Sequence, residues 1–94
     1  MKPRHAIEHE TRLLLQLVAA IKGLNVAGEL EAGRTISLTC PCGKLILPPL
    51  SVLSSVKDRQ RGLLKSKVER HLRNVHGISA RTITRVLKES FIAN

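Results

Sequence analysis

The chain has 94 residues and a strong excess of positive charge, with 16 Lys and Arg against 7 Asp and Glu, so its formal net charge is +9. This length accommodates one small domain with an appended element and excludes a large catalytic scaffold. The sequence contains one Phe and neither Tyr nor Trp, which excludes modules that stack single-stranded bases on aromatic side chains. The composition therefore predicts a small, basic, intracellular binding protein whose limited core needs a metal or a partner subunit for stability.

Residues 1–24 are predicted to contain one amphipathic helix, over residues 3–24. Pro3 suits a first helical turn, and Gly23 is a typical stop signal. No apolar run reaches the ~20 residues that a membrane span needs. The apolar positions repeat in a pattern that two arrangements explain equally well: packing on the helix's own domain, or a seam between two copies. The residues of this seam are Leu14, Leu17, Ile21 and Leu24.

A β-hairpin is predicted after a linker over residues 25–34. Residues 35–39 alternate between polar and apolar side chains, which is typical of a strand, and residues 40–43 form a turn. The returning strand covers residues 44–47 and is expected to stop at the two prolines that follow it.

The segment after the hairpin is predicted to continue as a loop and a helix. Residues 57–61 are highly charged and indicate an exposed basic loop. A helix is expected over residues 63–75, since apolar residues recur at helical spacing. Its buried stripe is predicted to consist of Leu64, Val68, Leu72 and Val75.

A last helix is predicted over residues 80–92, within a C-terminal segment assigned to residues 79–94. Gly77 is suited to end the preceding helix, and Ser79 is a suitable N-cap for the last one. Ile83, Val86 and Leu87 would face the core, while the basic side chains of this helix would line its exposed face.

Two cysteines and two histidines form a candidate zinc site. Cys40 and Cys42 lie on the hairpin turn, where a disulfide between them would close a strained ring, and His71 and His76 lie at a helix end. These are ligand types that zinc prefers in tetrahedral coordination. Since five residues on a regular helix separate the two imidazoles by ~140°, the helix must tighten or unwind over residues 74–77.

This pattern resembles a C2H2 zinc finger. The matching segments are residues 39–43 on the hairpin and residues 68–77 on the helix, with Val68 at the apolar position three before the first histidine. The resemblance implies a ββα unit over residues 35–78, with the two cysteines and two histidines as zinc ligands. We therefore expect an α+β fold, in which a small zinc-stapled finger lies between an N-terminal amphipathic helix and a C-terminal helix.

A second resemblance overlaps the first. Residues 77–87 look like the turn and recognition helix of a helix-turn-helix, with Gly77, Ile78, Ile83 and Val86 at turn and core positions. Either this helix reads bases or it only braces the finger. By contrast, His5 and His9 form a pair at i, i+4 that is expected to lie on a solvated helix face.

The charge distribution indicates a nucleic-acid partner. Residues 35–94 carry eleven basic and three acidic side chains, and the leading prediction is a zinc-dependent, duplex-DNA-binding transcriptional regulator. The alternative is a protein-interaction adaptor with a structural finger and an oligomerising N-terminal helix. An enzyme is not expected, because four protein ligands leave zinc no open position. The predicted nucleic-acid-binding residues are Lys57, Arg59, Arg61, Lys65, Lys67, Arg70, Arg73, Arg81, Arg85 and Lys88.

Overall fold

The fold is α+β, as the sequence predicts. The computed structural model describes residues 4–24 and 30–91. Of the predicted linker over residues 25–34, only residues 30–34 belong to the described part of the chain. Leu30 is buried in the core. The elements in chain order are α1 (Arg4–Gly23), β1 (Thr35–Thr39), β2 (Leu45–Ser51), the short 3-10 helix η1 (Ser54–Val56), α2 (Lys57–Asn74) and α3 (Ala80–Phe91).

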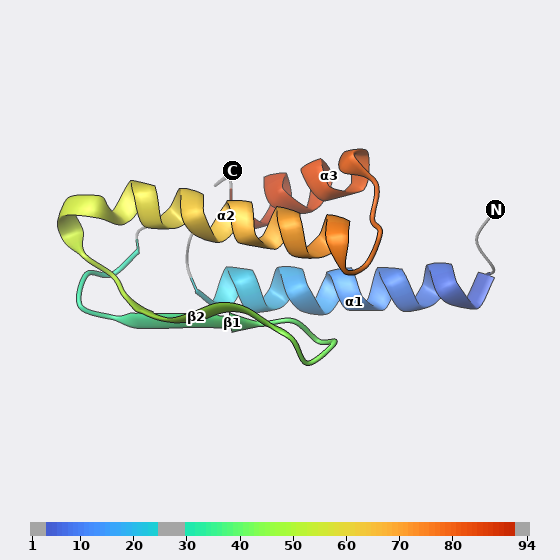
Figure 1. The fold of residues 1–94 in the computed structure, drawn as a ribbon, viewed down its shortest axis with the longest axis horizontal. Coiled ribbons are helices and arrows are strands. Elements are labelled where there is room, and N and C mark those ends of the chain that lie inside the picture. Colours follow the sequence, from blue (N-terminus) through green and yellow to red (C-terminus); the bar gives the residue numbers. More distant parts are fainter. Residues whose placement is uncertain (1–3, 25–29, 92–94) are drawn as a thin grey trace.

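The three α-helices and the hairpin enclose one hydrophobic core. Figure 1 shows α2 and α3 lying above α1 and the hairpin. Helix α1 packs against α3, and α2 packs against both α3 and β2. Among the described residues, no helix is long and apolar enough to cross a membrane.

Helix α1 is part of the core of its own chain. Leu17 and Ile21 are 0% exposed, and Leu14 and Leu24 pack against the same buried cluster. Of the two arrangements that the apolar pattern allowed, the structure shows the packing of α1 on its own domain. The predicted seam cannot join two copies through Leu17 or Ile21 while this core is intact.

The antiparallel hairpin is longer than predicted. Strand β2 continues through Pro48 and Pro49 to Ser51, which pairs with Thr35. Both prolines are exposed, and register shifts between Ile36 and Thr39 mark irregular pairing in this part of the ladder. Prolines are tolerated there because a two-stranded sheet has open edges and because bulged residues need not donate to the ladder.

Helix α2 begins at Lys57, so the predicted loop over residues 57–61 is wrong. Gln60 is buried and joins this first turn to the end of β2. Its Oε1 accepts a hydrogen bond from the Leu53 N–H at 3.0 Å, and its Nε2 donates to the Ser51 carbonyl at 2.9 Å. At the other end of the predicted stripe, Val75 is 44% exposed because the helix has already ended.

Helix α3 begins as predicted. Ser79 caps it, since the Thr82 N–H donates a hydrogen bond to Ser79 Oγ at 3.3 Å. The expected core residues of this helix are buried, and Phe91 joins them. The only aromatic residue of types Phe, Tyr and Trp is therefore part of the core.

Candidate metal centre

The hairpin tip places both cysteines. The Gly43 N–H donates to the Cys40 carbonyl at 2.8 Å, and the Cys40 N–H donates to the Lys44 carbonyl at 2.9 Å, so residues 40–43 form a tight turn. Gly43 has a φ of 96°, a conformation that side-chain-bearing residues rarely adopt. Cys40 is 2% exposed, whereas Cys42 on the same turn is exposed.

The C-terminal end of α2 places both histidines. The Val75 N–H donates to the His71 carbonyl at 2.9 Å, which completes the last α-helical turn. Gly77 then takes a φ of 61°, and the Ile78 N–H donates to the Leu72 carbonyl at 3.1 Å. The helix therefore unwinds over the predicted residues and turns His76 back beside His71.

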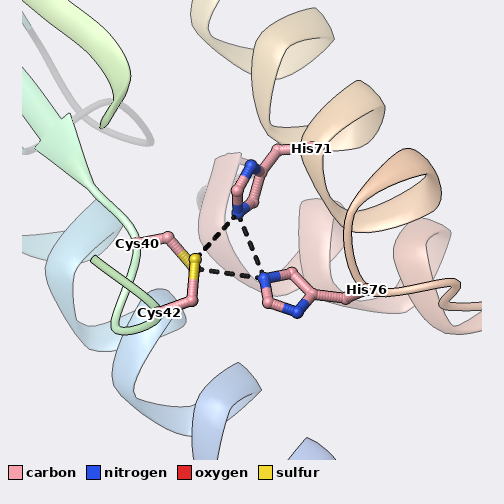
Figure 2. A group of neighbouring side chains, drawn as sticks. All are labelled: Cys40, Cys42, His71 and His76. Atoms are coloured by element: carbon pink, nitrogen blue, oxygen red, sulfur yellow. Dashed lines mark hydrogen bonds between the residues drawn. The ribbon is translucent and has the colours of Figure 1, made fainter. Parts of the chain in front are cut away.

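These two elements bring the four candidate ligands together, as Figure 2 shows. One ligand atom from each residue lies within 4.8 Å of the others. Cys40 Sγ and His76 Nε2 are 3.5 Å apart, as are Cys42 Sγ and His71 Nε2. The two Nε2 atoms are 3.1 Å apart.

The two sulfur–nitrogen distances and the nitrogen–nitrogen distance are close to the edges of a zinc tetrahedron. With Zn–S bonds of about 2.3 Å and Zn–N bonds of about 2.0 Å, a regular tetrahedron has sulfur–nitrogen edges of about 3.5 Å and a nitrogen–nitrogen edge of about 3.3 Å. The observed distances are 3.5 Å and 3.1 Å. The group could therefore hold a metal ion, and its two sulfur and two nitrogen donors are those of a structural zinc site.

The electrostatic surroundings favour neutral imidazoles. Burial lowers the pKa of His71, and the nearby His76 and Lys44 act in the same direction. Burial also lowers the pKa of His76, with further contributions from His9 and Lys44 and an opposing one from the Glu10 carboxylate. The neutral imidazole is the form that binds a metal, so both shifts assist coordination.

The pKa of the buried Cys40 thiol is shifted upward, in contrast to those of the two histidines. Burial raises the pKa of Cys40 to about 11, although a hydrogen bond from the Cys42 backbone acts against the increase. Without a cation, this thiol keeps its proton at neutral pH. A metal ion must displace that proton, since only the thiolate is a good ligand.

Three further residues of the site surroundings were not identified from the sequence. Lys44 directly follows the cysteine turn, so its position in the sequence could have indicated it. His9 and Glu10 gave no such signal, because they approach His76 only through the packing of α1. His9 is exposed, as expected, and the side chain of His5 lies outside the described residues.

The predicted nucleic-acid-binding residues lie along α2 and α3 rather than in one cluster. Seven of them are exposed, whereas Lys57, Arg61 and Lys67 are half-buried. Two are engaged in ion pairs within α2: Arg61 with Asp58 at 3.5 Å, and Arg73 with Glu69. The exposed residues are Arg59, Lys65, Arg70, Arg73, Arg81, Arg85 and Lys88.

No protein family, curated protein or solved structure matches the chain. The resemblance to a C2H2 finger therefore rests on the four candidate ligands, their order along the chain and the hairpin and helix that carry them.

Proposed function

We propose that the chain is a zinc-stapled nucleic-acid-binding protein that binds duplex DNA and acts in transcriptional regulation. The observation that carries the zinc assignment is the convergence of Cys40, Cys42, His71 and His76, whose ligand atoms lie within 4.8 Å of one another, with three separations close to tetrahedral edges. The ion would tie the hairpin to the end of α2 and hold the turn into α3. Zinc supplies folding free energy in such closed sites, and no catalytic step is assigned to it.

The charge of the molecule supports a polyanionic partner. On α2, Arg59 and Arg70 lie opposite the buried stripe of the helix, and Lys65 is exposed on another side of the same helix. On α3, Arg81 and Lys88 are both exposed. Cationic side chains on helix surfaces can contact phosphates without disturbing the core.

The core composition favours duplex over single-stranded nucleic acid. Phe91 is 7% exposed and packs in the core, so neither it nor any Tyr or Trp can offer a stacking surface for splayed bases. Duplex DNA needs no such stacking, since phosphate contacts and groove contacts suffice.

The turn between α2 and α3 supports base reading by α3 as a finer hypothesis. Gly77 and buried Ile78 form the turn, and Ser79 caps α3, as expected for the start of a recognition helix. If α3 enters a groove, substituting Arg81 weakens binding to a preferred site more than binding to random duplex DNA.

The test is a salt titration of the zinc-loaded protein against a fluorescent duplex. The variant Arg59→Gln/Lys65→Gln/Arg70→Gln removes three exposed cations from α2. Each lost phosphate contact lowers the slope of log affinity against log salt by about 0.9. We expect a clearly shallower slope and weaker binding, with an unchanged circular dichroism spectrum.

The control removes the same charge from elsewhere on the chain: Arg12→Gln/Lys22→Gln/Arg34→Gln. All three of these residues are exposed and precede the hairpin. The control should retain the parent slope. Equal losses in both triple variants, or no duplex binding by the parent, would refute the nucleic-acid function and favour the adaptor.

A further inference from the structure

An open apolar groove of about 370 Å³ lies between α1 and α3. Helix α1 contributes Leu14, Leu15 and Val18 to its lining, and α3 contributes Val86. Leu15 is 66% exposed, which is the largest value among the exposed large hydrophobic residues described. An exposed leucine beside a partly open apolar groove is typical of a protein-interaction site.

The charge of this groove differs from that of the rest of the molecule. Two carboxylates, from Glu10 and Glu89, line it together with one guanidinium, from Arg85. The chain as a whole carries 16 basic side chains against 7 acidic ones. In the lining of this groove, by contrast, acidic groups outnumber basic groups, and this disfavours nucleic acid as its occupant.

The same charge pattern suits a second copy of this chain. Two molecules with a formal charge of +9 repel each other, and this repulsion is smallest where the contacting surfaces carry no excess of positive charge. In a two-fold symmetric contact, each patch meets an identical patch, so Arg85 of one copy can face the carboxylates of the other. The charged groups that line the groove can therefore pair with the same groups of a second copy.

The exposed surface of α1 beside the groove also suits a second helix. Thr11, Leu15 and Ala19 recur every fourth residue and are all exposed, so they lie along one side of the helix. Small side chains on either side of a leucine allow two helices to approach closely. The N-terminal end of α1 extends beyond the end of α2 (Figure 1).

We propose that the chain forms a two-fold symmetric homodimer through the groove between α1 and α3, with Leu15 of each copy inserted against the apolar lining of the other. This interface differs from the seam predicted from the sequence: Leu14 belongs to both, but Leu17 and Ile21 stay in the core of their own chain. It does not depend on the nucleic-acid function, because assembly is measured without DNA.

The test is sedimentation velocity of the full-length, zinc-loaded protein over a concentration series. The parent should shift from the 10.4 kDa monomer toward twice that mass as concentration rises. Leu15→Gln removes the central apolar contact and should weaken dimerisation at least tenfold. Glu89→Lys adds a cation to each rim and should also weaken it, more strongly at low salt.

The matched control is Leu53→Gln, which changes a leucine that is 55% exposed outside the groove. It should dimerise like the parent. Thermal unfolding followed by circular dichroism verifies that each variant is folded, as expected for exposed positions. A parent that stays monomeric to high concentration would overturn the proposal, as would dimerisation that Leu15→Gln and Leu53→Gln affect equally.

Discussion

The two cysteines have the same chemistry but different surroundings. Cys40 belongs to the buried core, whereas Cys42 is exposed on the same turn. Burial raises the pKa of Cys40 to about 11, so the buried thiol carries a proton that a metal must displace. The coordination chemistry of the site is consequently coupled to the packing of the hairpin.

This coupling predicts how metal affinity depends on pH. Since the Cys40 thiol stays protonated below a pKa of about 11, its proton is released on metal binding throughout the range between about pH 7 and pH 9. Apparent zinc affinity should therefore rise at least tenfold per pH unit there. Competition with a chromophoric chelator, corrected for the chelator's own protonation, measures this slope.

The histidines add to the pH dependence only in acid. Their pKa values are lowered from 6.5, so both imidazoles are neutral above that value and release no proton on binding. Below it, protonated imidazoles compete with the metal, and the slope should steepen. A zinc affinity that does not change between about pH 7 and pH 9 would contradict the prediction that Cys40 loses a proton when it binds the metal.

The cysteines also predict distinct substitution effects. Cys42→Ser and Cys40→Ser should both abolish stoichiometric zinc binding in native mass spectrometry. Both variants should lose most of the folded structure with the metal, so they are compared by the structure that remains. Cys40→Ser should retain less helical circular dichroism signal than Cys42→Ser, because it places a hydroxyl at an apolar position at a cost of about 1–3 kcal/mol. Equal spectra for the two variants would contradict the structural role of buried Cys40.

At the scale of whole elements, the end of α2 determines whether the site can form. His71 and His76 would point about 140° apart on a continuous helix. The left-handed residue Gly77 ends the helix and returns His76 to the cluster. Helix termination here is therefore a requirement of the metal site.

Two glycine substitutions in or beside α2 should have opposite effects. A Cβ at Gly77 would meet no atom within 4 Å, but its φ of 61° makes alanine strained, by about 1–2 kcal/mol. A Cβ at Gly62 would also meet nothing, and there alanine favours the helix by about 1 kcal/mol. Chemical denaturation should show Gly77→Ala destabilised with weaker zinc binding, and Gly62→Ala stabilised with unchanged zinc binding.

The sequence predicted the element types and the candidate ligands, but not two element boundaries. The ligands were identifiable because zinc restricts donor type so strongly that Cys40, Cys42, His71 and His76 stand out. The start of α2 was missed because Gln60, a polar residue, occupies a buried position of the helical stripe. Only its hydrogen bonds to the end of β2 make that burial favourable.

The other missed boundary is the end of β2. Prolines generally stop strands, and the sequence contains no signal that the hairpin tolerates irregular pairing beside them. The sequence also left open what the apolar stripe of α1 packs against, because such a stripe fits a partner helix and a domain core equally well. The packing of α1 against α3 is a tertiary property that joins the first and last helices of the fold.

At the scale of the whole molecule, one core contains residues from all three α-helices and from both strands. The buried cluster includes Leu17 of α1, Ile36 of β1, Leu64 of α2 and Ile83 of α3. Cys40 belongs to the same cluster, so the candidate metal centre and the core share a residue. Loss of the metal should therefore affect the entire fold.

Metal removal tests this cooperativity. A strong chelator should unfold at least residues 35–78 and, through the shared core, most of the helical signal in circular dichroism. The variant Cys42→Ser is the control, since it should bind no zinc and show no response to the chelator. A native mass near 10.4 kDa without zinc, together with an unchanged spectrum in chelator, would contradict a structural metal.

The separation of the ligands along the chain also determines when the site can be completed during synthesis. The sulfur–nitrogen contacts join residues 29 and 36 positions apart, so both thiols leave the ribosome well before either imidazole is available. At about 5–20 residues per second, this interval lasts seconds. The nascent chain therefore presents both thiols for seconds before the proposed zinc site can be completed.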